Sequence, residues 1–407
     1  MATPKLRFKE FDGDWSLKSI NDIASKVGSG STPRGGAAAY VDKGIIFIRS
    51  QNVNDNQLLL DDVVFIPESI HEKMSGSEVL PNDILLNITG ASIGRSCVVP
   101  DTFSEGNVNQ HVCIIRTPNE NPIFVQSFLS SEKGQNHIQS KQVGGGREGL
   151  NFQAIRSIDF EMPLKEEQTK IASFLSAVDE KISQLTQKHE LFNQYKQGMM
   201  QKLFSRQIRF KADDGSEFGE WERTTLGEKG TFLKGKGISK ADIIEGGILP
   251  CIRYGELYTY YGEIISNVIS ATNLDRDTLV LSKANDVLIP GSGETQIDIA
   301  TASCVLDDDI ALSGDLNIYR TKENGIFISY MIRSSLKMQI AQLAQGNSVV
   351  HLYSSQLKGV QLSLPCLGEQ TKIANFLSAI DQKIEVVIQQ IEQAKQWKKG
   401  LLQQMFV

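Results

Sequence analysis

A long helical segment that occurs twice constrains this chain more than any other feature. Residues 167–182 align with residues 369–384 at an offset of 202 (369 − 167). This offset is about half of the 407 residues and far exceeds the roughly 20 to 50 residues of a solenoid repeat. The sequence therefore predicts one duplicated module. The two copies differ at only three positions, which are Ser173/Asn375, Val178/Ile380 and Glu180/Gln382.

Both copies carry apolar residues at alternating spacings of four and three residues, the heptad pattern of a coiled coil. A proline precedes each helix, and acidic residues occupy the first turn, as is typical of a helix start. Each seam is narrow, so we expect it to pack against one partner helix. At about 1.5 Å per residue, a helix of about 40 residues spans roughly 60 Å. The first seam contains Ile171, Leu175, Val178, Ile182, Leu185 and Phe192, and the second contains Ile373, Leu377, Ile380, Ile384, Val387 and Ile391.

Polar residues interrupt these seams. We interpret His189 as a position that sets the register between two helices and assign it no catalytic role. Lys196 and Lys398 share one repeat position, where they either set register in the same way or extend their ammonium groups to solvent.

The segment that precedes each long helix predicts a strand-rich domain, and the two domains are expected to share one fold. Apolar runs at 45–48, 63–66, 84–88 and 111–115 are separated by Gly, Pro, Asn and Asp clusters, as in strands and turns, and a helix is expected from Pro122. We expect an α+β chain with domains at 1–162 and 208–364 and long helices at 163–207 and 365–407. Matched short anchors recur between the domains, namely Phe47-Ile-Arg49 with Cys251-Ile-Arg253, Asn82-Asp-Ile-Leu85 with Asn285-Asp-Val-Leu288, and Arg116 with Arg320.

Between these anchors the two domains diverge strongly, whereas the helices stay nearly identical. This contrast suggests two domains that read two different targets and are held by a common frame. The net charge is −6, and the excess acid lies in the domains. Such a balance argues against a protein that grips nucleic acid by bulk charge alone, because phosphate neutralisation supplies most non-specific affinity.

The chain starts without a basic and apolar leader, and no window approaches the roughly 20 apolar residues of a membrane span. We therefore expect a cytoplasmic protein. The five cysteines are odd in number and include no Cys-x-x-Cys pair, so we predict neither a disulfide framework nor a zinc site and expect buried thiols.

Motifs for catalysis are missing. The glycine-rich stretches lack the Gly-x4-Gly-Lys-[Ser/Thr] pattern of a nucleotide-binding loop, and no Gly-x-Gly-x-x-Gly opens a βαβ unit. The nearest approach to an adenine methyltransferase loop, Asn121-Pro-Ile-Phe124, lacks the second proline, and its proline is better explained as a helix start. The five histidines are scattered. We therefore predict no catalysis and no metal site in this chain alone.

The residues that remain as functional candidates are those suited to binding DNA. Glycine-rich, polar and lightly basic loops recur at matched places in the two domains. Glycine allows close backbone approach to a phosphate, and Arg, Gln, Asn and Glu side chains can read base edges; taken singly, each residue is also compatible with an ordinary solvated loop. The candidate DNA-binding residues are Thr32, Arg34, Arg49, Gln51, Asn52, Ser92, Arg95, Lys141 and Arg147 in the first domain, and Lys234, Lys236, Lys240, Arg253, Tyr254, Glu256, Ser292, Gln296, Asn347, Ser348 and His351 in the second.

The pattern of variable domain, Pro-Leu-x-Glu-Gln-x-x-Ile-Ala-x-x-Leu-like helix, variable domain and second such helix resembles the specificity (S) subunit of Type I restriction-modification systems. The resemblance covers essentially the whole chain. Its motif stands here at Pro163–Leu175 and Pro365–Leu377, with Cys366 in place of the leucine expected after proline.

The resemblance implies two target recognition domains, each reading one half of a bipartite DNA sequence. It also implies antiparallel spacer helices that bind two methyltransferase (M) subunits. Adenine methylation would come from those subunits, and cleavage from added restriction (R) subunits, so that S-adenosylmethionine, ATP and Mg²⁺ would bind the partners and no cofactor would bind this chain. Two other classes stay open: an enzyme acting alone, which would need a cofactor motif, and a coiled-coil adaptor for proteins, which would show no DNA selectivity.

Overall fold

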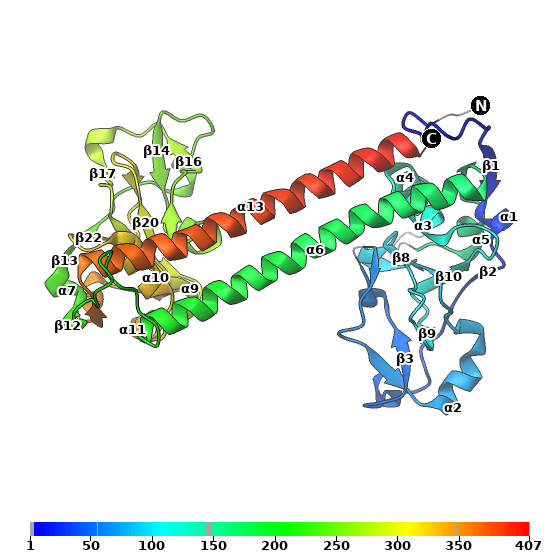
Figure 1. Cartoon of the computed structure of the whole chain (residues 1–407), viewed down its shortest axis with the longest axis horizontal. Coiled ribbons are helices and arrows are strands. Elements are labelled where there is room, and N and C mark those ends of the chain that lie inside the picture. Colours follow the sequence, from blue (N-terminus) through cyan, green and yellow to red (C-terminus); the bar gives the residue numbers. More distant parts are fainter. Residues whose placement is uncertain (1–3, 55, 143–148, 347–348, 407) are drawn as a thin grey trace. The chain divides into compact units, whose positions relative to one another are not determined.

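The computed structural model describes residues 4–54, 56–142, 149–346 and 349–406. The chain divides into two compact units, Met1–Gln187 with Gln389–Val407 (unit 1) and Lys188–Ile388 (unit 2). The two long helices, α6 (Lys165–Phe204) and α13 (Leu367–Met405), pack together in antiparallel directions (Figure 1). Each unit therefore combines a strand-rich domain, called domain 1 or domain 2 below, with a part of both helices.

Domain 1 is organised around a four-stranded sheet with the order β2-β10-β7-β8 and a three-stranded sheet with the order β6-β3-β9. The first and last strands, β1 and β11, pair with each other and close the domain. Its elements are β1 (Ser16–Ser19), α1 (Ile20–Ile23), β2 (Lys26–Ser29), β3 (Ile45–Ile48), β4 (Val53–Asn54), β5 (Gln57–Leu58), β6 (Val64–Ile66), α2 (Glu68–His71), β7 (Ile84–Asn87), β8 (Ser96–Val98), β9 (Gly106–Val108), β10 (Val112–Arg116), α3 (Pro122–Ser130), α4 (Glu132–Ser140), α5 (Phe152–Arg156) and β11 (Asp159–Met162).

Domain 2 repeats this plan with a five-stranded sheet, β13-β22-β18-β20-β15, and a four-stranded sheet, β16-β14-β21-β17. Here β12 and β24 form the closing pair. Its elements are β12 (Glu222–Thr225), α7 (Leu226–Lys229), β13 (Gly230–Lys234), β14 (Leu249–Ile252), α8 (Glu256–Thr259), β15 (Ile264–Ile265), β16 (Ser270–Thr272), β17 (Val280–Leu281), β18 (Val287–Pro290), β19 (Ser292–Gly293), α9 (Gln296–Ile299), β20 (Ser303–Val305), β21 (Ala311–Leu312), β22 (Leu316–Thr321), α10 (Gly325–Arg333), α11 (Lys337–Leu343), β23 (Val350–His351), α12 (Ser354–Leu357) and β24 (Gln361–Leu364).

The strands expected from the apolar runs are confirmed as β3, β6, β7 and β10, and four of their eight ends are shifted by one residue. The helix expected from Pro122 is α3, and the side chain of Asn121 caps it by accepting hydrogen bonds from the amides of Ile123 and Phe124. This capping role explains the Asn-Pro pair of residues 121–122 without a methyltransferase loop.

The matched aspartate and arginine anchors of the two domains are structural. Asp83 accepts two hydrogen bonds from Arg116, both at 2.7 Å, and Asp286 accepts two from Arg320 at 2.8 and 2.6 Å. Each aspartate side chain is 1% exposed, so the arginine offsets the cost of burying its charge. These pairs join the strands β7 and β10 in domain 1, and β18 and β22 in domain 2.

The Glu-Gln of the repeated motif fastens each long helix to its own domain. Glu167 accepts two hydrogen bonds from Arg7, both at 2.7 Å, and Glu369 accepts two from Arg209 at 3.0 and 2.8 Å. The neighbouring Gln168 donates to Glu120 and to the carbonyl of Pro163 and accepts from the amide of Asn121, and Gln370 makes the same three bonds with Glu323, Pro365 and Asn324. The motif thus fixes the direction in which each helix leaves the domain.

The expectation that each seam meets only a partner helix is wrong for the first turns of both helices. Ile171, Leu175 and Val178 lie in the core of domain 1 beside Phe124 and Phe128, in the same cluster as the end of α13. Ile373, Leu377 and Ile380 lie likewise in the core of domain 2. The reason is that each helix starts directly after the closing strand pair, so its first turns cover the domain. Among the remaining seam residues, Leu185, Val387 and Ile391 are buried, and Ile182, Phe192 and Ile384 are half-buried.

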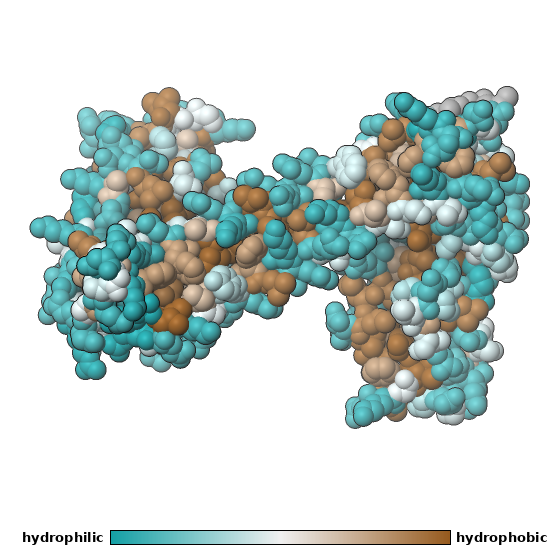
Figure 2. Space-filling model, in the orientation of Figure 1, coloured by the Kyte–Doolittle hydropathy of each residue, from teal (hydrophilic) through white to brown (hydrophobic). Residues whose placement is uncertain are grey.

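Hydrophilic side chains cover much of the visible surface of each unit, while apolar side chains also reach the surface on the helical segments (Figure 2). No helix in the described part of the chain is long and apolar enough to cross a membrane. Four cysteines are buried as expected, but Cys366 is exposed. The expectation for Cys366 is wrong because this residue lies between the last strand of domain 2 and the start of α13, outside the core.

Replacing Glu369 with alanine is expected to destabilise unit 2 by about 3 kcal/mol, the typical cost of leaving one partner of a buried pair uncompensated. Arg209 would lose its carboxylate, and the indole of Trp221 would lose the acceptor that lies 3.2 Å from its Nε1. Urea unfolding monitored by tryptophan fluorescence measures the change. The control is Glu166→Ala, which removes an exposed carboxylate from the first turn of α6. Equal midpoints for Glu369→Ala and the wild type would contradict the assigned role.

Candidate nucleic-acid interface

The candidate loops of domain 1 meet at one end of its sheets. The amide of Asn109, in the turn before β10, donates to the carbonyl of Ile48 at 3.0 Å, and its own carbonyl accepts from the amide of Gly30 at 3.1 Å. On the other side of the same turn, the amide of Ile88 donates to the carbonyl of His111 at 3.0 Å. These bonds bring the loops that begin at residues 30, 48 and 88 together around the turn at 109–111.

A continuous chain of polar side chains runs across this turn. The hydroxyl of Thr32 bonds to the amide oxygen of Gln110, and the amide nitrogen of Gln110 lies 3.0 Å from Nε2 of His111. Nδ1 of His111 lies 2.6 Å from the hydroxyl of Thr89. Thr32 was predicted from the sequence, whereas Thr89, Gln110 and His111 were missed. Their only sequence signal is that they flank the strands β7 and β10, which spacing alone does not distinguish from other strand ends.

Domain 2 builds the equivalent edge with the same backbone bonds. The amide of Ser313 donates to the carbonyl of Ile252 at 3.0 Å, as that of Asn109 does to Ile48. The amide of Gly291 donates to the carbonyl of Asp315 at 2.7 Å, matching the bond between residues 88 and 111. A third pair matches too, because Leu352 N bonds to Gly291 O at 3.0 Å, and Leu150 N bonds to Ile88 O at 2.9 Å. The frame is common, but the side chains mounted on it differ.

Matched glycines serve this frame. A Cβ on Gly30 would lie 1.7 Å from the carbonyl oxygen of Val108, and a Cβ on Gly235 would lie 2.0 Å from that of Ser313. Neither position tolerates a side chain because another backbone segment crosses there. At these two positions the recurrence of glycine therefore follows from the close approach of two protein strands, and a phosphate contact is not needed to explain it.

Arg49 and Arg253 occupy equivalent turns. Each follows the last residue of a strand, β3 or β14, and each backbone amide is bonded by the side chain three residues later, Asn52 at 2.9 Å or Glu256 at 3.1 Å. Arg49 has one distant acidic neighbour, Asp62 at 4.0 Å, and its buried Nε has no partner in the described residues. The Arg253 side chain makes no hydrogen bond or ion pair within the described part of the chain. Both guanidinium groups therefore retain capacity for an external acceptor.

Other candidates serve the fold. Asn52 is 2% exposed and also donates to the carbonyls of Leu59 and Asp62, and Ser292 is 4% exposed with its hydroxyl 3.1 Å from Nδ1 of His351. Glu256 accepts hydrogen bonds from the amide of Arg253 and from the Ser270 hydroxyl. The side chains of Asn52, Ser292 and Glu256 are thus used within the domains, because the turns that carry the arginines and the β19–β23 pair need their polar atoms.

The remaining candidates fall into three groups. The first consists of exposed cations without a hydrogen-bond or ion-pair partner among the described residues: Arg34, Arg95, Lys234, Lys236 and Lys240. The second group consists of exposed or half-buried residues. Gln51 bonds to Asp62, Lys141 to Ser157, and Gln296 to the carbonyl of Ala344. His351 bonds to Ser292 and stacks on Tyr353, and the last two members, Ser92 and Tyr254, are half-buried. The third group, Arg147, Asn347 and Ser348, lies outside the described residues.

Arg95 also lines a groove of about 630 Å³ in unit 1, together with Lys395, Lys398 and Lys399 of α13. Glu132 is the only carboxylate among the described lining residues. The corresponding α6 positions in unit 2, 202 residues earlier, carry Asn193, Lys196 and Gln197. Unit 1 therefore has a local excess of positive charge, which the overall charge of the chain does not reveal.

The described residues do not bring potential metal ligands together. Within the described ranges, no group of three or more His, Cys, Asp or Glu side chains is placed to hold a metal ion. Burial raises the pKa of the Cys97 thiol to about 12 and that of the Cys113 thiol to about 12, so neither is a nucleophile at neutral pH.

Comparison with known proteins gives the family. A model of the type I restriction modification DNA specificity domain matches residues 12–192 and again residues 219–396. The chain belongs to this family. Each match spans one domain and the first part of the long helix that follows it, so the duplication seen in the repeated helix is a duplication of the specificity domain.

Individual relatives agree. One relative is a Methanocaldococcus jannaschii protein provisionally named the type I restriction enzyme MjaX specificity subunit. This chain is 26% identical to it, with 98% of this chain and 94% of that protein covered. It is 24% identical to the type I restriction enzyme MjaVIII specificity subunit of the same organism, with 81% of this chain and 80% of that protein covered.

The fold is also similar to that of solved structures. The S subunit of the type I restriction-modification system from M. genitalium matches with a TM-score of 0.60 at 14% identity, covering 100% of this chain and 99% of that one. A chain in a structure of complex assembly and conformational transition of the type I R-M system matches with a TM-score of 0.57 at 14% identity, covering 96% and 97%. At this identity the similarity concerns the fold.

Replacing Arg253 with alanine is expected to relax selectivity at the base pairs that domain 2 reads, because a bidentate arginine contact discriminates by about 1 to 3 kcal/mol. The measurement is binding of the protein, in complex with its methyltransferase subunit, to DNA duplexes that carry single base changes. Arg49→Ala should act in the same way on the other half of the site. Arg223→Ala, which removes an exposed arginine from β12, is the control. Unchanged selectivity in both loop variants would remove these arginines from the interface.

Proposed function

We propose that this chain is the DNA-reading subunit of a type I restriction-modification complex, in which each domain reads one half of a bipartite sequence through the loop edge described above. The observation that carries the proposal is the pair of equivalent turns at Arg49 and Arg253. The two turns share one backbone frame and present an arginine at the same place, yet the residues around them differ. This is the arrangement expected of two readers with different targets.

We infer that phosphate contacts come partly from the exposed cations and partly from partner subunits. The candidate surface offers exposed side chains such as Arg34, Arg95 and Lys240, which have no partner among the described residues, and the lysine-lined groove of unit 1 adds further positive charge. An acidic chain can bind DNA in this way when a partner supplies the remaining neutralisation. The DNA target also implies a cytoplasmic location.

The long helices are proposed to dock two methyltransferase subunits and to set the distance between the half-sites. Support comes from large apolar side chains on the helices of which half or more is exposed: Leu191 is 64% exposed, Tyr195 50% and Trp397 53%. Tyr195 and Trp397 are equivalent residues of the repeat, so they offer two similar docking points. In this proposal the methyltransferase subunits bind S-adenosylmethionine and methylate adenine, and restriction subunits bring ATP- and Mg²⁺-dependent cleavage.

The decisive test reconstitutes methylation. The chain alone is expected to transfer no methyl group to DNA, whereas the chain with its methyltransferase subunit should modify adenines within one bipartite sequence. Sequencing of modified adenines in cells that carry both subunits identifies this sequence. Methylation by the chain alone would contradict the proposal, and a stable complex without any DNA selectivity would favour a coiled-coil adaptor instead.

The docking points make a separate prediction. Tyr195→Ala and Trp397→Ala should each weaken binding of one methyltransferase subunit, because truncation of an aromatic residue at an interface hot spot costs about 2 kcal/mol or more. Native mass spectrometry of the complex measures the number of bound subunits. Leu164→Ala, at an exposed position before the start of α6, is the control. Full occupancy in the double variant would place the docking surface elsewhere.

A further inference from the structure

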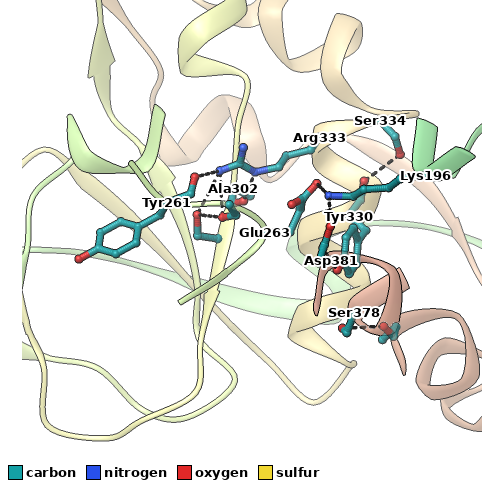
Figure 3. Close-up of polar contacts among 12 residues, drawn as sticks. Lys196, Tyr261, Glu263, Ala302, Tyr330, Arg333, Ser334, Ser378 and Asp381 are labelled. Atoms are coloured by element: carbon teal, nitrogen blue, oxygen red, sulfur yellow. Dashed lines mark hydrogen bonds and ion pairs between the residues drawn. The ribbon is translucent and has the colours of Figure 1, made fainter. Parts of the chain in front are cut away.

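A charged cluster in unit 2 joins both long helices to domain 2 (Figure 3). The ammonium group of Lys196 on α6 lies 2.7 Å from Oδ1 of Asp381 on α13 and 2.9 Å from Oε1 of Glu263, in the segment between α8 and β15. The side chains of Lys196 and Glu263 are only 15% and 13% exposed. Lys196 therefore does not extend to solvent, but bridges one residue of the partner helix and one of the domain.

Tyr330 on α10 completes the cluster. Its hydroxyl donates a hydrogen bond to Asp381, and the Lys196 ammonium group lies 5.3 Å from the centre of its ring. Burial raises the pKa of Tyr330, so the phenol stays protonated and remains a donor. Burial also raises the pKa of Asp381, against the opposing effect of the Lys196 ammonium group. Removing that ammonium group would leave two carboxylates near one another with little solvent.

Arg333, one turn further along α10, holds the rest of the same segment. Its guanidinium group donates to the carbonyl oxygens of Leu257, Tyr261 and Gly262 at 3.0, 2.8 and 3.0 Å, and to that of Ala302 at 2.6 Å. Residues 257–263 are thus fixed along their length by Arg333 and at their end by the bond between Glu263 and Lys196.

This segment continues directly from the turn that presents Arg253. The backbone carbonyl of Glu256 accepts hydrogen bonds from the amides of Tyr260 and Tyr261 at 2.9 and 2.8 Å. The carboxylate of Glu256 accepts the bond from the Arg253 amide at 3.1 Å. The stretch between Arg253 and Glu263 is therefore one hydrogen-bonded piece, and its far end is attached to the helices.

Unit 1 has only part of this cluster. Lys398, at the repeat position of Lys196, bonds to Asp179 of α6 at 2.5 Å, and within the described residues it has no partner in domain 1. When the cap residues Asn121 and Asn324 are aligned, Ser127 and Ser130 of α3 correspond to Tyr330 and Arg333. The helix-to-helix pair is thus common to both units, whereas a connection to the reading segment is seen in unit 2 and not among the described residues of unit 1.

We propose that Lys196 is a positioning residue for the second reader: through Glu263 it holds the 257–263 segment, and with it the Arg253 turn, in a fixed place relative to the helices. Among the described residues, the first reader has no such ionic connection. Loss of the Lys196–Glu263 bond should therefore affect recognition of one half-site and leave recognition of the other half-site unchanged.

The direct test measures local opening and does not depend on DNA. In hydrogen–deuterium exchange of the full chain, Lys196→Met should increase exchange at the amides of residues 257–263 by about tenfold, while amides at 49–53 keep their wild-type rates. Lys398→Met is the matched control and should leave both segments unchanged. Glu263→Ala, which keeps the Lys196–Asp381 pair, should reproduce the effect even if Lys196→Met does not fold. Wild-type exchange at 257–263 in Glu263→Ala, or an equal increase throughout unit 2 in both variants, would overturn the proposal.

The functional test rests on the proposed DNA-reading role. With the methyltransferase subunit bound, Lys196→Met should reduce discrimination against base changes in the half-site identified by Arg253→Ala by about tenfold, which corresponds to about 1.4 kcal/mol. Discrimination in the other half-site should stay unchanged, and Lys196→Arg should restore most of the loss. Equal losses in both half-sites, or none, would overturn the positioning role. If the wild-type complex shows no sequence selectivity, the proposed function fails instead, and the exchange experiment still decides whether Lys196 holds the segment.

Discussion

The whole structure depends on the two buried carboxylates of Glu167 and Glu369. Each lies at the start of a long helix and is held by an arginine that precedes the first strand of the same domain, Arg7 or Arg209. A buried carboxylate is unfavourable unless it is paired, so this contact forms only when the beginning of the domain, its closing strand pair and the helix are all in place. The next residue, a glutamine in both copies, attaches the N-terminus of α3 or α10 to the same point. Helix direction is therefore coupled to correct folding of each domain.

The parts of the fold that could be predicted from the sequence are those with local or repeated signals. The heptad seams, the apolar runs of β3, β7 and β10 and the Asn-Pro start of α3 were all visible because period and capping are short-range properties. The meeting of the first helical turns with the domain cores was not visible. Ile171 and Leu175 look alike whether they face a helix or a mixed core, since a heptad pattern reports only which residues are apolar and not what covers them.

The candidate site was harder to predict for a related reason. Recurrence picked out the turns at Arg49 and Arg253, which the structure shows to be equivalent. It does not separate residues that build a turn from residues that the turn presents. Asn52 and Glu256 occupy equivalent positions because each accepts a hydrogen bond from the amide of the arginine in its turn. Gly30 and Gly235 are matched because the backbone of another segment lies too close for a side chain. Thr89, Gln110 and His111 form their network only through strand pairing that joins residues distant in sequence. In this protein the matched residues mostly maintain the backbone arrangement that the two domains share.

The single exposed cysteine gives this chain a practical property. Cys97, Cys113, Cys251 and Cys304 are buried, and only Cys366 is open to solvent. A maleimide fluorophore or spin label would therefore react selectively at the junction between domain 2 and α13 without any prior mutagenesis. Because this junction is where the domain passes into the helix, the attached probe would report changes in the local environment of that connection when partner subunits bind.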